Sequence, residues 1–160
     1  MQLCRECRWL YAGDTRILCM SCGSTRLTIP CAENLTGIVE KLLDRGIEVV
    51  SASCDVFDTY EEDTGKTGKI VLLQIELGFL YPAEMFENIS PDWMTYEYHT
   101  VQDNIKGPKY TALSHSERFY DVDDDEIDYA TTLTIKNLEV WLDDLNAAAY
   151  RCVWTLAGYM

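Results

Sequence analysis

The feature that most constrains this chain is a set of four cysteines near its start. Cys4 and Cys7 form one C-x-x-C pair, Cys19 and Cys22 form a second, and eleven residues separate the two pairs. A C-x-x-C pair folds into a compact turn that places two thiolates on one ion. Two such turns complete the tetrahedron of sulfurs, about 2.3 Å from the ion, that zinc prefers. The spacing therefore predicts one Zn²⁺ bound by Cys4, Cys7, Cys19 and Cys22.

Two structural disulfides are the alternative use of the same four cysteines. The chain has seven cysteines in total, the others being Cys31, Cys54 and Cys152, and its first residues lack the apolar stretch of a secretory signal. Three further thiols and the missing export signal favour reduced cysteines. We therefore expect a metal site in a cytoplasmic protein.

The residues between the two cysteine pairs are typical of a β-hairpin. Residues 9–11 and 16–18 are predicted strands joined by a turn at 12–15. Gly23 follows the second pair, where a left-handed backbone often completes the turn. On these motifs the segment 4–27 resembles a zinc ribbon. Because four cysteines leave no coordination position open for water, the expected ion is structural rather than catalytic.

The rest of the chain is strongly acidic. The 27 acidic and 13 basic side chains give a net charge of −14, and the acidic excess lies entirely beyond the first thirty residues. Such a surface repels phosphate backbones and anionic membranes, and the longest apolar runs are shorter than the ~20 residues of a membrane span. We therefore divide the chain into a zinc ribbon at 1–30 and an acidic domain at 31–160.

Hydrophobic periodicity predicts an α+β fold for the acidic domain. Apolar residues recur at helical spacing over residues 35–43 and alternate over 47–57 and 69–81, which we expect to form an antiparallel hairpin. The first of these strands is predicted to place four residues on one face, namely Val50, Ala52, Cys54 and Val56.

The second half of the domain is predicted to end in a long helix. An apolar stripe runs from Ile135 to Leu156, with Thr134 as the expected cap and Gly158 as the end. Before it, the sequence predicts a short helix and three strands, at residues 83–89, 94–101, 109–113 and 118–122. This order predicts a mostly antiparallel sheet with helices on one face.

The charge indicates a binding protein rather than an enzyme. We expect its carboxylates to dock on a protein partner that is basic or binds nucleic acid. In size and charge the chain is similar to the acidic inhibitors and nucleic-acid mimics that bacteriophages carry against host defences. That likeness implies an inhibitor whose carboxylates replace phosphates. The expected contact residues form one acidic run: Asp121, Asp123, Asp124, Asp125, Glu126 and Asp128.

Two other functions stay open. The zinc ribbon is a candidate adaptor that contacts nucleic acid in transcription or replication through a local basic patch. A small hydrolase would instead use His99 or His115 with a nucleophile. The arginines of the basic patch would be Arg5, Arg8, Arg16 and Arg26.

The acidic run also has part of the pattern of a calcium loop. Asp121, Asp123 and Asp125 alternate like its first ligands, but Glu126 and Thr132 stand where the loop needs glycine and glutamate. We therefore expect at most a weak Ca²⁺ or Mg²⁺ site there.

Overall fold

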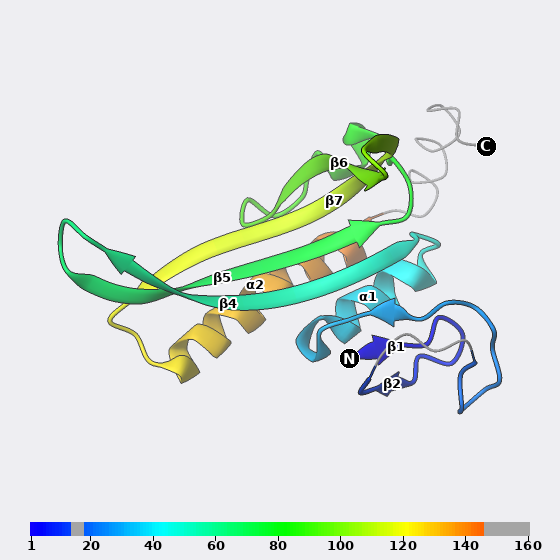
Figure 1. Ribbon diagram of the computed structural model, residues 1–160, viewed down its shortest axis with the longest axis horizontal. Helices are drawn as coiled ribbons and strands as arrows, with labels where there is room; N and C mark the ends of the chain where they lie inside the picture. The colour runs from blue at the N-terminus through cyan, green and yellow to red at the C-terminus, as the bar shows by residue number, and fades with distance from the viewer. Residues whose placement is uncertain (14–17, 146–160) are drawn as a thin grey trace.

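The computed structural model describes residues 1–13 and 18–145 and has the predicted α+β architecture (Figure 1). A small sheet and a larger sheet follow one another along the chain, and two α-helices pack against the larger one. The elements are β1 (Gln2–Leu3), β2 (Leu10–Tyr11), β3 (Ile29–Pro30), η1 (Glu33–Leu35), α1 (Thr36–Asp44), β4 (Val49–Glu61), β5 (Lys66–Leu77), η2 (Ala83–Phe86), β6 (Met94–Gln102), β7 (Ile105–Tyr120) and α2 (Asp124–Asp144).

The larger sheet has the strand order β4-β5-β7-β6, and all of its neighbours are antiparallel. The predicted hairpin is confirmed as β4 and β5. The strands predicted at 109–113 and 118–122 are instead parts of one strand, β7, which pairs with β5 on one side and β6 on the other. The polar residues between them do not interrupt β7, because they alternate with Leu113 and the buried His115 across the two faces of the sheet.

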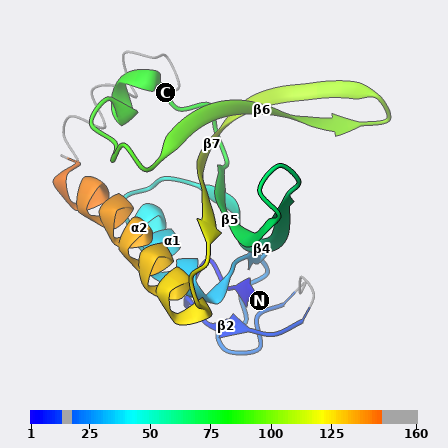
Figure 2. The same ribbon diagram turned by 90° about the vertical axis from the view of Figure 1, so that its left-hand side faces the viewer.

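Both helices cover the same face of the larger sheet, as Figure 2 shows. The alternation over residues 69–81 predicts five residues on this face. Phe79 is one of them, but it lies beyond the end of β5 and is 45% exposed. The other four are at most 2% exposed: Val71, Leu73, Ile75 and Leu77. The helices meet them with apolar stripes, which include Ile38, Val39 and Leu42 of α1 and Ile135, Leu138 and Leu142 of α2. Together these residues form one hydrophobic core.

The predicted apolar face of β4 is only partly right. Val49 pairs with Leu77 while Ser51 pairs with Glu76, so the strand contains a bulge at this point. The bulge places both Val49 and Ala52 in the core and leaves Val50 42% exposed. Strict strand alternation could not predict that both residues are buried, because Val49 and Ala52 are three positions apart and would lie on opposite faces. Cys54 is partly buried, as predicted, whereas Val56 further along is exposed.

Helix α2 begins earlier than predicted. The side chain of Asp123 caps it by accepting a hydrogen bond from the backbone N–H of Glu126 at 2.9 Å. Thr134, the predicted cap, is buried inside the helix. Several of the acidic residues therefore occupy the first turn of α2, where the helix dipole stabilises negative charge. The predicted continuation through Leu156 to Gly158 lies outside the described residues.

The first thirty residues share the core of the rest of the chain. In the small sheet β1 lies between β2 and β3, and Leu3 and Ile29 are fully buried in the common core. Residue 31 then forms a bridge to β4, and the N–H of Ala32 donates to the carbonyl of Ala52 at 2.9 Å. The division at residues 1–30 and 31–160 stays a prediction, and the two parts pack as neighbours.

We predict that Asp123→Ala lowers the free energy of unfolding by about 1 kcal/mol, because it removes the cap of α2. Asp144→Ala is the matched control, since Asp144 lies at the negative end of the same helix and its loss is expected to be neutral or slightly stabilising. Chemical denaturation measures both. Equal destabilisation by the two substitutions would contradict the assignment of Asp123 as the cap.

Candidate metal centre

The two C-x-x-C pairs form the same backbone turn. The N–H of Arg8 donates to the carbonyl of Cys4 at 3.1 Å, and the N–H of Gly23 donates to the carbonyl of Cys19 at 2.8 Å. The residue after each pair is left-handed, with φ of 63° at Arg8 and 74° at Gly23. In the second turn, Gly23 has the left-handed conformation predicted for it. In the first turn, the non-glycine residue Arg8 adopts the same conformation. The sequence holds no glycine signal for that turn.

The strand predicted at residues 9–11 has a different partner. β2 pairs with β1, with Leu10 opposite Leu3 and Tyr11 opposite Gln2. Most of the partner predicted for it, residues 16–18, lies outside the described residues. The small sheet therefore forms between the residues before and after the first turn, and β3 completes it by pairing with β1.

The four cysteine sulfurs converge on one point. All four lie within 4.8 Å of one another. The Sγ atoms of Cys4 and Cys22 are 3.8 Å apart, and those of Cys7 and Cys19 are 3.7 Å apart. A tetrahedron with metal–sulfur bonds of about 2.3 Å has edges of about 3.8 Å, so these separations fit a bound ion.

The same separations exclude the disulfide alternative in this structure. A disulfide bond is about 2.05 Å long, and all four cysteines are free. The donor set consists of four thiolate sulfurs, which suit a soft or borderline metal such as zinc. The four close cysteines can therefore hold a metal ion, and a set of four protein ligands matches a structural site.

Backbone amides prepare one of the sulfurs for metal binding. Hydrogen bonds from the backbone of Cys22 and Ser21 lower the pKa of Cys19 to about 6. A lowered pKa favours the thiolate, which is the form that binds metal. At Cys22 a backbone hydrogen bond from Ser24 acts in the same direction, but burial and the neighbouring thiols raise its pKa to about 11. A divalent cation among the sulfurs favours deprotonation of all four.

The arginines near the metal centre join it to the acidic domain. Arg5 is largely buried, donates from Nε to the carbonyl of Leu27 at 2.7 Å, and pairs with Glu48 at 3.1 Å. Arg26 pairs with Glu6 at 2.7 Å and lies 3.7 Å from Glu48. Glu48 lies in the connection between α1 and β4. It thus forms ion pairs with two arginines of the first thirty residues.

Arg8 is also paired, with Asp44 at the end of α1 at 3.3 Å. Arg16, the fourth residue of the predicted basic patch, lies outside the described residues. The three described arginines are thus each neutralised by a carboxylate. The nucleic-acid alternative stays a prediction, and this arrangement gives it no support.

The two histidines lie apart. His99 is exposed on β6, and its Nδ1 is 3.0 Å from the carbonyl of Gly107. His115 is buried on β7, with Nδ1 2.6 Å from the carbonyl of Asp92 and Nε2 3.4 Å from Glu117. In the described part of the chain, neither imidazole hydrogen-bonds a cysteine or serine side chain. The hydrolase alternative therefore stays a prediction as well.

The acidic run does not form a calcium loop. The carboxylate of Asp123 caps α2, and Asp125 already lies in the first turn of that helix. Asp124 pairs with Lys69 of β5 at 2.8 Å. The run is thus the start of a helix rather than a loop that wraps around a cation.

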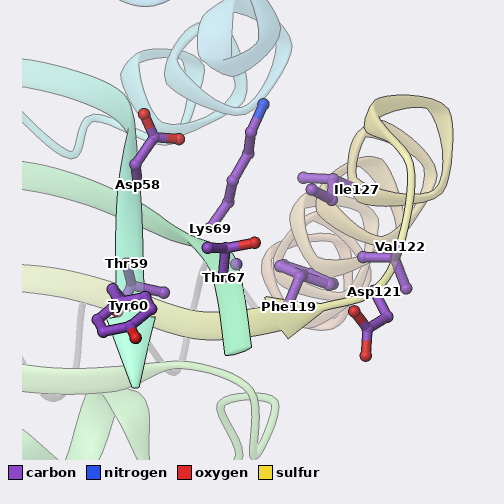
Figure 3. A pocket seen from close by; sticks show the side chains of 10 residues that line it. Asp58, Thr59, Tyr60, Thr67, Lys69, Phe119, Asp121, Val122 and Ile127 are labelled. Atoms are coloured by element: carbon purple, nitrogen blue, oxygen red, sulfur yellow. The ribbon is translucent and has the colours of Figure 1, made fainter. Parts of the chain in front are cut away.

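A groove that the sequence did not predict lies beside the acidic run. It has a volume of about 580 Å³ and opens between the end of the β4–β5 hairpin, the end of β7 and the start of α2 (Figure 3). Each strand contributes a few residues only, so no local motif marks the groove. It is lined by Asp58, Thr59, Tyr60, Thr67, Gly68, Lys69, Phe119, Asp121, Val122 and Ile127.

Comparisons with protein-family models, with curated proteins and with solved structures found no match for this chain. The four clustered cysteines form a possible metal-binding site, which is consistent with a zinc ribbon segment. Among the described residues, no helix is long and apolar enough to cross a membrane.

We predict that the purified protein contains one zinc ion per chain and that Cys4→Ser loses it. Structural zinc contributes on the order of 10 kcal/mol in small zinc-binding peptides, so its loss is expected to unfold the first thirty residues. Cys54→Ser is the matched control, because Cys54 lies on β4 away from the cluster. Elemental analysis measures the metal. Much less than one zinc per parent chain, or full zinc in Cys4→Ser, would refute the prediction.

Proposed function

We propose that this protein is a non-enzymatic binding protein, stabilised by zinc, whose acidic end docks on a basic surface of another protein. We define the acidic end as residues 58–69 and 118–128. Two acidic stretches that are distant in the sequence lie at the same end of the molecule, one on the β4–β5 hairpin and one at the start of α2 (Figure 1). Together they carry ten acidic and three basic side chains, a net charge of −7 that is half of the chain's −14.

The convergence of these two stretches is the observation that carries the proposal. Lys69 joins them through its 2.8 Å contact with Asp124, and Asp58 and Asp128 also lie close enough to raise the pKa of Lys69 after Asp124 itself. The remaining carboxylates have no ion pair among the described residues of the acidic end. Because they are exposed, they set up a negative field that attracts a basic partner and accelerates its association.

The basic side chains elsewhere in the described chain are mostly neutralised by pairing. The acidic end differs from the rest of the chain in density, because its two short stretches carry −7 of the net charge of −14. The pairs outside the acidic end are Arg5–Glu48, Arg8–Asp44, Arg26–Glu6, Lys41–Asp143 and Lys109–Glu97.

The partner we favour is a protein that itself binds nucleic acid. Its basic groove is built to contact closely spaced phosphates, and clustered carboxylates on a folded scaffold offer charge of the same sign. Docking of the acidic end would then block that groove and inhibit the partner. The zinc ion would act at a distance, by holding the first thirty residues against the scaffold.

Retention of basic proteins tests the proposal. The immobilised protein is expected to retain basic proteins from a lysate at low salt and to release them at high salt. A fourfold variant of the acidic end (Asp58→Asn, Glu62→Gln, Asp125→Asn and Asp128→Asn) is expected to lose most of this retention. Mass spectrometry identifies the retained proteins, and added duplex DNA should compete with the immobilised protein for them.

The control carries the same change of net charge at four exposed acids elsewhere: Glu33→Gln, Asp55→Asn, Glu84→Gln and Asp103→Asn. It is expected to retain basic proteins nearly as well as the parent. Equal loss in the two variants, or no basic protein retained by the parent at low salt, would contradict the proposal.

A further inference from the structure

The groove at the acidic end combines apolar walls with charged margins (Figure 3). Phe119 is partly buried at its floor, and Val122 and Ile127 form the wall on the side of α2. The ring of Tyr60 is 62% exposed on the opposite side. Such a surface can take up the apolar part of a side chain while leaving its polar end at the margin.

The charges of the groove favour a cation. Asp58 and Asp121 line it, and neither carboxylate has an ion pair among the described residues. Lys69 is the one basic residue in the lining, and Asp124 already neutralises it at 2.8 Å. Anions such as phosphate would meet repulsion from the surrounding carboxylates.

We propose that this groove binds an arginine side chain from an extended basic segment of the partner. The guanidinium pairs with the groove carboxylates of Asp58 or Asp121 and stacks on an aromatic ring, while the methylenes pack against Val122 and Ile127. This inference rests on the proposed function and names the residue type that anchors the partner.

Arginine fits this groove better than lysine for two physical reasons. Its planar guanidinium stacks on aromatic rings such as Tyr60 and Phe119 and forms bidentate hydrogen bonds with carboxylates. Lysine offers a compact, strongly hydrated ammonium that does neither. A general attraction between charges would treat the two alike, so the preference for arginine separates the groove from the field around it.

Binding of two labelled peptides tests the inference on the zinc-loaded, full-length protein. One peptide alternates arginine with serine, the other alternates lysine with serine, and fluorescence anisotropy measures the affinity of each. The arginine peptide is expected to bind about tenfold more tightly. The double variant Asp58→Asn and Asp121→Asn is expected to weaken its binding by about tenfold or more.

The matched control is Asp55→Asn with Asp103→Asn. It removes the same charge from two exposed sites outside the groove lining. Asp121 and Asp103 both have positive φ, at 55° and 51°, and asparagine tolerates that conformation. Loss of affinity in the groove variant is therefore not attributable to backbone strain, and the control is expected to bind nearly as the parent does.

A second pair of variants tests for a gain of affinity. Lys69→Met frees Asp124 and removes the one cation of the groove, so it is expected to tighten binding of the arginine peptide several-fold. Lys109→Met breaks a 3.1 Å pair with Glu97 on β6 and β7 and changes the net charge equally. It is expected to have a much smaller effect.

Three results would overturn the inference: equal affinity for the two peptides, equal effects of the two lysine variants, or an unchanged affinity in the groove variant. If the fourfold variant of the acidic end then lost binding of both peptides, docking at the acidic end would stand without the groove. Failure of the parent to bind either peptide at low salt would count against both proposals.

Discussion

Four sulfurs held within 4.8 Å of one another are the constraint on which the first part of this structure depends. Each short strand there has only two residues, and three such strands do not form a stable sheet alone. The two cysteine turns fix the chain around one point, which lets β1 pair with β3 and places Leu3 and Ile29 in the common core. A metal ion at this point would therefore contribute to the packing of α1 and β4 as well as to its own turns.

The distribution of charge follows from the same arrangement. Arginines beside the metal centre pair with Glu48 and Asp44 of the acidic domain, so basic charge near the cysteines serves to attach the two parts. β4 runs from this attachment to the opposite end of the molecule, where the hairpin with β5 meets the start of α2 (Figure 1). Half of the chain's net negative charge, −7 of −14, lies in the two stretches at that far end. The structure thus separates the stabilising site from the surface that we propose for docking.

Those features that depend on residues close in the sequence could be predicted. The cysteine spacing predicted the sulfur cluster, because each pair forms its turn locally and the chemistry of four thiolates is specific. Strict alternation predicted the buried face of β5, and helical spacing predicted α1. The acidic start of α2 was not predicted, because the sequence alone does not distinguish an aspartate that caps a helix from one in a solvated loop.

Features that depend on pairing between distant residues could not be predicted. The bulge at Val50 is set by the register with β5, and the ion pair of Arg5 with Glu48 spans residues far apart in the chain. The groove requires β4, β5, β7 and α2 together, so none of its residues stood out alone. Periodicity describes one element at a time, whereas these features arise where elements meet.

X-ray absorption at the zinc edge shows whether the four sulfurs bind one ion. It measures the type, number and distance of the atoms bound to the ion in the intact protein. We expect four sulfur neighbours at about 2.3 Å and no oxygen or nitrogen neighbour. Fewer than four sulfurs, or a shell of oxygen and nitrogen ligands, would contradict this expectation.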